Sequence, residues 1–121
     1  RRRKRRKALQ AIKKEMKDAE RYLLEENLDG FHAAVLKVLS RFLDVRFGIS
    51  VASSTHGDVY SQLLESNVSP ELAERVRQEL ESSEFGRFAP SAVQREDMRN
   101  SLERTQALLR QLDGVKARRG A

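Results

Sequence analysis

An all-α fold, a compact bundle of about five helices, is the class that this sequence predicts. Leucine, alanine, glutamate, arginine and lysine dominate its 121 residues, a composition that favours helix. Apolar residues recur three or four positions apart in several segments, and no segment has the pattern of a strand. The chain has no cysteine, yet its length is enough for one domain to bury a core without disulfides.

The first expected helix covers about residues 4–26. Its apolar residues form one stripe at spacings of three and four: Leu9, Ile12, Met16, Ala19 and Leu23. Asn27 and the pair Asp29-Gly30 then break the helix, and Asp29 is the expected N-cap of the next one.

The second expected helix, about residues 31–46, is the most apolar segment, which predicts that it lies at the centre of the bundle. Because the turn before it is short, the first two helices should form an antiparallel hairpin. Gly48 is the expected helix stop, and Ile49 and Val51 should fold the following loop onto the core.

The third and fourth helices have clear start signals. Thr55 followed by Asp58 is a near capping box, and the helix that it opens should end near residues 66–67. Ser69 followed by Pro70 starts the fourth helix, because proline at the first helical position gives up no hydrogen bond that is needed. The inward stripe of this helix is Leu72, Val76 and Leu80.

The last helix should begin after Pro90, with Ser91 as its cap, and continue to about Leu112, where Gly114 ends it. One side of this helix carries Val93, Met98, Leu102, Thr105, Leu109 and Leu112. From Met98 onward the spacing alternates between four and three. This is the seam of a helix packed along another helix, most simply the first one.

Positive charge is concentrated at the two ends of the chain. The formal net charge is +6, and residues 1–7 are all basic. Removing these seven from the 24 basic residues leaves 17 against 18 acidic ones, so the rest of the chain is nearly neutral. The pattern predicts a basic juxtamembrane-like segment at 1–7, a helical domain at 8–113 and a basic flexible tail at 114–121.

This charge distribution argues against DNA recognition by the folded part. A helix-turn-helix would fall in residues 55–84, and its second helix would need cations that face phosphate. That helix carries five glutamates and two arginines: Glu71, Glu74, Glu79, Glu81, Glu84, Arg75 and Arg77. Nucleic-acid binding through the basic N-terminal arm remains the alternative function.

The sequence contains no recognisable constellation of catalytic or metal-binding residues. His32 and His56 are isolated, whereas zinc needs three or four donors. We expect His32 at the edge of an apolar helix face and His56 in a first helical turn. The glycines form no phosphate-binding motif, and the pairs Glu25-Glu26 and Glu96-Asp97 are expected on exposed helix surfaces. The prediction is no enzyme activity, no cofactor and no metal.

The N-terminal basic run is a candidate membrane-surface segment. The chain starts with arginine and not methionine, so we expect it to be a piece of a longer protein. A basic block of this kind is typical of the cytoplasmic flank of a transmembrane helix. It is equally compatible with a solvated tail, a nuclear-type address or an RNA-binding arm. The residues concerned are Arg1, Arg2, Arg3, Lys4, Arg5, Arg6 and Lys7.

The stretch SSEFGRFAP, residues 82–90, joins the last two expected helices. We expect Gly86 to adopt the left-handed conformation that closes a helix, and Phe85 and Phe88 to fold back onto the core. The alternative is a partner-binding hook, in which Arg87 and the two rings contact another protein.

The same stretch carries a resemblance to a known family. In order, the chain has "THGDVYSQLL", "NVSPELAERV" and "ESSEFGRFAP", followed by a long final helix. This order resembles the C-terminal cytoplasmic region of the BatD family, the aerotolerance (oxygen tolerance) membrane proteins of bacteria. Residues 84–85 and 87–90 match the family's corner motif, while Ser83 stands where cysteine is common and Gly86 where alanine is. The similar layout covers about residues 8–112, but only the corner is specific.

The resemblance implies a location and a set of partners. BatD-like proteins have a periplasmic β-rich portion, a transmembrane helix and a cytoplasmic helical tail, so residues 1–7 would be the positive-inside flank of that helix. The family is encoded beside MoxR-type ATPases and von Willebrand factor A domain proteins. The implied role is a non-catalytic adaptor or scaffold at the cytoplasmic face of the inner membrane, linked to aerotolerance or stress response.

Overall fold

The computed structural model describes residues 2–88 and 91–116, without the side chains of Arg2, Arg87 and residues 91–93. In this part of the chain the secondary structure is entirely helical, which confirms the all-α prediction. The helices are α1 (Arg2–Leu24), α2 (Leu28–Phe47), α3 (His56–Glu65), α4 (Pro70–Phe85) and α5 (Ser91–Asp113), with a 3₁₀ turn, η1 (Gly86–Phe88), between α4 and α5.

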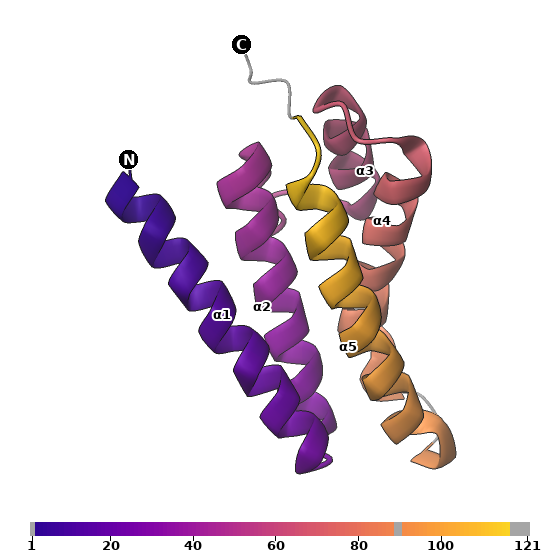
Figure 1. Cartoon of the computed structure of the whole chain (residues 1–121). Coiled ribbons are helices and arrows are strands. Elements are labelled where there is room, and N and C mark those ends of the chain that lie inside the picture. Colours follow the sequence, from indigo (N-terminus) through magenta and orange to yellow (C-terminus); the bar gives the residue numbers. More distant parts are fainter. Residues whose placement is uncertain (1, 89–90, 117–121) are drawn as a thin grey trace.

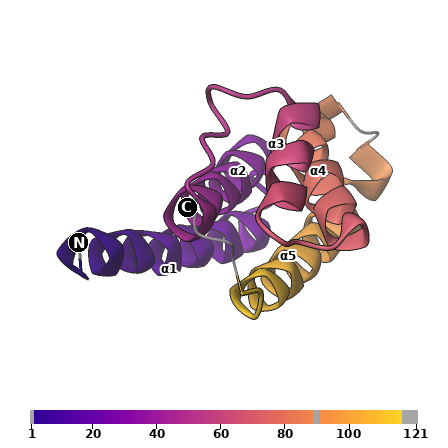
Figure 2. The same ribbon diagram turned by 90° about the horizontal axis from the view of Figure 1, so that it is seen from above.

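Helix α2 lies at the centre of the bundle, as predicted. It forms an antiparallel hairpin with α1 on one side and packs against α4 and α5 on the other (Figure 1). Helix α3 packs on α4, and this pair lies on the side of the bundle away from α1 (Figure 2). The prediction that α5 packs most simply along α1 is wrong: α5 packs mainly on α2 and α4 and touches α1 less. An alternating spacing of four and three defines a seam but does not identify the helix that covers it.

The core is drawn from all five helices and from the loop after α2. Five α2 residues are completely buried: Phe31, Val35, Val38, Leu39 and Leu43. Ile49 is 2% exposed and Val51 is partly buried, so the loop after α2 folds onto the core as expected. Met98 and Leu112 of the predicted α5 seam are also buried. This burial is the main source of stability for a helical bundle.

The helix ends follow local side-chain chemistry, with one correction. The predicted capping box is present at the start of α3, where Thr55 and Asp58 bond to each other's backbone. Gly48 closes α2 in the left-handed conformation, with φ of 69°. The N-cap of α2, however, is Asn27, whose side chain accepts a 2.9 Å hydrogen bond from the Gly30 amide. Asp29 is instead in the first turn, because α2 begins three residues earlier than expected.

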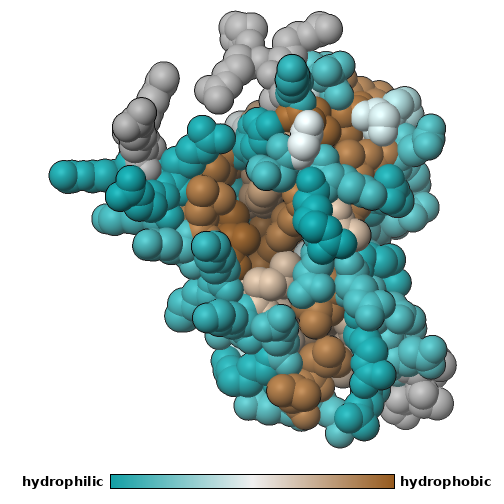
Figure 3. Space-filling view, in the orientation of Figure 1, coloured by the Kyte–Doolittle hydropathy of each residue, from teal (hydrophilic) through white to brown (hydrophobic). Residues whose placement is uncertain are grey.

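Residues 2–7 of the basic run are the first residues of α1. Residues 3–7 are all exposed, and Leu9, the first residue of the predicted stripe, is 43% exposed. Figure 1 shows that α1 diverges from the bundle toward its N-terminus, so its first turns lack a helix on which to pack. In Figure 3, apolar surface is visible in the resulting space between α1 and α5. Arg1 lies outside the described residues.

The two ends of the bundle are formed by different segments of the chain. The start of α1 and the C-terminal ends of α2 and α5 lie at one end (Figure 1). There the Arg46 guanidinium donates to the backbone carbonyls of Asp113 and Val115, which holds the end of α5 against α2. The α1–α2 turn and the corner between α4 and α5 lie at the other end. Among the described residues, no helix is both long enough and apolar enough to cross a bilayer.

Candidate functional site

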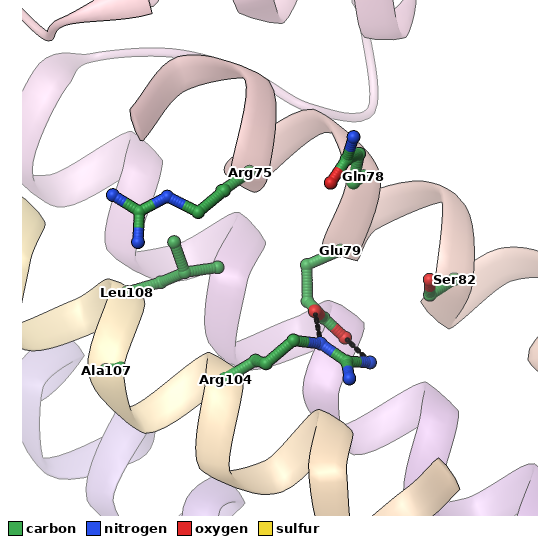
Figure 4. A pocket seen from close by; sticks show the side chains of 7 residues that line it. All are labelled: Arg75, Gln78, Glu79, Ser82, Arg104, Ala107 and Leu108. Atoms are coloured by element: carbon green, nitrogen blue, oxygen red, sulfur yellow. Dashed lines mark hydrogen bonds and ion pairs between the residues drawn. The ribbon is translucent and has the colours of Figure 1, made fainter. Parts of the chain in front are cut away.

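Two adjoining pockets form a groove between α4 and α5, which we call the α4–α5 groove. Each pocket has a volume of about 350 Å³, and Ser82 and Arg104 line both. The Arg75 pocket (Figure 4) is lined by Arg75, Gln78, Glu79, Ser82, Arg104, Ala107 and Leu108. The His32 pocket, nearer the corner, is lined by Leu28, His32, Ser82, Phe85, Gly86, Gln94, Asp97, Ser101 and Arg104. A groove of this size can accept a few side chains of another molecule.

A buried carboxylate lines the Arg75 pocket. The Glu79 side chain is only 4% exposed and is held by α5. Arg104 Nε lies 2.6 Å from Glu79 Oε1 (Figure 4). Ser101 Oγ donates to Glu79 Oε2 at 2.7 Å. The hydrogen bond to Glu79 raises the pKa of Arg104, which therefore stays charged. The Arg104 side chain is 53% exposed, so the pair is reached by water from one side only.

Glu79 was not singled out from the sequence among the five glutamates of α4. The signal that identifies it is its position: Glu79 follows Leu72 by seven residues and Val76 by three, so it lies on the inward stripe of α4. A carboxylate on such a stripe needs a partner from another helix. Ser101 and Arg104, three residues apart on α5, are that partner, and only the packing of α4 on α5 brings them together.

His32 is buried beneath the corner, and not at a helix edge as predicted. It is 6% exposed, and its ring meets the Phe31 ring edge-on with centroids 5.3 Å apart. Burial lowers the pKa of His32, while the charges of Glu79, Asp29 and Asp97 oppose this effect. Among the described residues, its Nδ1 atom has no hydrogen-bond partner. The imidazole is therefore neutral in the folded protein near neutral pH.

Gly86 is required for a different reason from the one expected. Its φ of −59° and ψ of −28° are right-handed helical values, so the predicted left-handed closure of α4 is wrong. A Cβ at this position would lie 2.5 Å from both Cε1 and Nε2 of His32, which is closer than atoms can approach. Glycine thus allows the backbone of the corner to pack directly on the imidazole ring.

The rings of the corner point outward, which contradicts the expectation that they join the core. Phe85 is 60% exposed and Phe88 is 71% exposed; we call these two residues the aromatic corner. Inward positions are taken by small residues instead: Ser83 is 6% exposed and its Oγ donates to the Glu79 carbonyl at 2.9 Å. The backbone of Arg87 lies in η1, and its side chain lies outside the described part.

The remaining polar clusters have structural explanations. His56 lies 3.1 Å from Glu84 across the α3–α4 interface, and Arg77 pairs with Glu74 and Glu81 along α4. Glu25, Glu26, Glu96 and Asp97 are exposed, as predicted. Within residues 2–88 and 91–116, no three side chains of His, Asp or Glu are grouped so that they could hold a metal ion.

Comparisons with protein-family models, with curated proteins and with solved structures gave no match. The groove, the aromatic corner and the basic start of α1 are therefore the features from which we infer a function.

Proposed function

We propose that this chain is a non-catalytic helical interaction domain, an adaptor or scaffold, that binds a protein partner at the aromatic corner. The observation that carries the proposal is the exposure of Phe85 and Phe88 beside the His32 pocket. Burying one phenylalanine side chain contributes about 1.5–3 kcal/mol, so two exposed rings forgo considerable stability unless a partner covers them. Aromatic side chains next to a pocket are typical anchors of protein interfaces.

The parent protein in this proposal is a BatD-like membrane protein, with this domain on the cytoplasmic face of the inner membrane. Its support is the order of sequence motifs that ends in the corner, Glu84-Phe85-Gly86-Arg87-Phe88-Ala89-Pro90. On this proposal the partners are von Willebrand factor A domain proteins or a MoxR-type ATPase. The corner that resembles the family also carries the exposed rings of Phe85 in α4 and Phe88 in η1, which favours a role in contact with a partner.

The basic start of α1 is proposed to lie against the anionic membrane surface. Its support is that residues 3–7 are exposed all round the helix. Each basic residue near an anionic leaflet contributes about 1 kcal/mol. Since the aromatic corner lies at the other end of the bundle from the start of α1, the corner would be held away from the membrane surface, free to bind a partner.

Nucleic-acid binding through the same arm is the alternative function. The same five exposed cations, Arg3, Lys4, Arg5, Arg6 and Lys7, support it. Strongly salt-dependent binding to unrelated DNA or RNA, lost when the arm is deleted, would favour this alternative over the membrane.

Site-specific photo-crosslinking in cells tests the proposal. A photoreactive phenylalanine analogue is placed at Phe85, at Phe88, or at Leu24, which is 80% exposed and serves as the control. We expect a discrete protein adduct from the two corner positions and none from Leu24. We also expect that Arg87→Glu leaves the circular dichroism spectrum unchanged but weakens the adduct. Equal adducts from all three positions would contradict binding at the corner.

A further inference from the structure

The α4–α5 groove is basic at the end away from the corner. Arg75 is exposed and makes no hydrogen bond or ion pair with any residue that the structure describes. Arg104 uses Nε and Nη2 on Glu79, so the Arg75 pocket contains two guanidinium groups and one carboxylate. Glu71 and Glu103, one turn away on α4 and α5, line neither pocket. The pocket therefore has a net positive charge that a carboxylate from another molecule can balance.

The corner end of the groove offers apolar groups beside its polar lining residues, which are Ser82, Gln94, Asp97, Ser101 and Arg104. Leu28, the buried ring of His32 and the exposed ring of Phe85 line this pocket. Its charged lining group besides Arg104 is Asp97, which disfavours a second carboxylate there. An aliphatic or aromatic side chain would bury its surface against these groups and cover part of Phe85.

The distance between the two ends defines the length of a fitting ligand. Arg75 and Phe85 are ten residues apart on one helix, which corresponds to about 15 Å. This is the length of about ten residues of a bound helix or about five residues of an extended segment. Ser82 and Arg104 line both pockets, so one segment can occupy both without a break.

We infer that the α4–α5 groove binds a short acidic segment of the protein partner, with a carboxylate at the Arg75 end and a bulky apolar side chain in the His32 pocket. This inference depends on the proposed function, because it names the chemistry of the partner that the aromatic corner anchors. It also sets the direction in which the segment lies: its acidic end lies toward Ala107 and Leu108 on α5, and its apolar end lies at η1.

Selection from a phage-displayed library of random peptides tests the inference. Peptides about twelve residues long span the groove as a helix and can also cross it when extended. We expect the intact domain to enrich peptides that combine Asp or Glu with Leu, Ile, Phe or Trp. Individual enriched peptides should bind Arg75→Glu at least about tenfold more weakly, since the new charge repels their carboxylate, and added salt should weaken binding to the wild type.

Arg99→Glu is the matched control. Arg99 is exposed on α5, lines neither pocket and, like Arg75, has a glutamate four residues later, so the two reversals change the net charge by the same amount. Binding to Arg99→Glu should stay within about twofold of the wild type. Equal weakening by both variants, enrichment without acidic residues, or no enrichment would overturn the inference. Peptides whose binding is weakened by substitution of Phe85 but not by substitution of Arg75 would also overturn the inference. They would remain consistent with the proposed interaction domain.

Discussion

Gly86 has an ordinary right-handed helical backbone, and yet a side chain does not fit there. Elsewhere in a helix, Gly→Ala stabilises by about 0.4–1 kcal/mol. At Gly86 the new methyl group would lie 2.5 Å from the His32 ring, so we expect Gly86→Ala to lower the free energy of unfolding by about 1–3 kcal/mol. Urea denaturation followed by circular dichroism measures this change.

The matched control is Gly57→Ala in the first turn of α3. A Cβ there meets only the Thr55 hydroxyl, at an ordinary 3.8 Å, so this variant should be as stable as the wild type or more so. In a His32→Ala background, Gly86→Ala should lower the free energy of unfolding much less than it does in the wild type. If Gly86→Ala cost the same in both backgrounds, close packing on His32 would not be the reason for this glycine.

His32 should make stability depend on pH. Burial lowers its pKa, against opposing charges from Asp29 on α2, Glu79 on α4 and Asp97 on α5. Unfolding returns the pKa to about 6.5, so below this pH the unfolded chain takes up a proton that the folded chain does not. The contribution of His32 to the free energy of unfolding should thus be constant above about pH 7. It should fall as the pH drops through about 6.5.

Urea unfolding of the wild type and of His32→Phe at about pH 7.5 and about pH 5.5 measures this contribution, because the variant lacks the titrating group. The wild type should lose more stability than the variant. NMR of His56→Gln, in which His32 is the only remaining histidine, follows its imidazole directly. An imidazole that titrates at or above about 6.5 in the folded protein would contradict the prediction.

At the scale of elements, α4 and α5 are joined by a buried charge. Arg104→Ala leaves the Glu79 carboxylate, 4% exposed, with Ser101 as its one remaining side-chain partner among the described residues. We expect a loss of about 1–3 kcal/mol in the free energy of unfolding, because a buried charge without its cation is costly. Adding Glu79→Gln to Arg104→Ala should recover part of that loss, since the amide can still accept from Ser101.

Arg77→Ala is the control for this pair. Arg77 contacts Glu74 and Glu81 on its own helix, and all three side chains are about one-third exposed or more, so Arg77→Ala should lower the free energy of unfolding by much less than Arg104→Ala. If Arg77→Ala and Arg104→Ala were equally destabilising in urea, the Glu79–Arg104 pair would not hold α4 to α5 more strongly than a surface pair.

At the scale of the whole molecule, the basic arm should contribute to membrane binding but not to the stability of the fold. Deleting residues 1–7 removes side chains that are exposed where the structure describes them. The free energy of unfolding should therefore change by no more than about 0.5 kcal/mol. The same deletion should abolish flotation with vesicles that contain phosphatidylserine, and the intact chain should not float with purely zwitterionic vesicles. Removing the tail after Lys116 is the control. Unchanged flotation of the arm deletion would contradict the proposed role of the arm.

The sequence by itself determined the helices and several of their ends. The stripes of apolar residues predicted every α-helix. Three predicted helix ends are also confirmed: the starts at Thr55-Asp58 and Ser69-Pro70, and the stop at Gly48. The short first turn also predicted the α1–α2 hairpin correctly. These features depend on residues within a few positions of each other, so local chemistry is enough to specify them.

Tertiary packing alone decided the candidate site. The pairing of Glu79 with Arg104 joins residues 25 positions apart, and the fit of Gly86 on His32 joins residues of different helices. Packing also leaves the rings of Phe85 and Phe88 exposed at the corner, beside the His32 pocket. Spacing along the chain shows which face of a helix is apolar. It does not show which residues of other helices pack on that face. That packing determines which surface remains exposed for a partner.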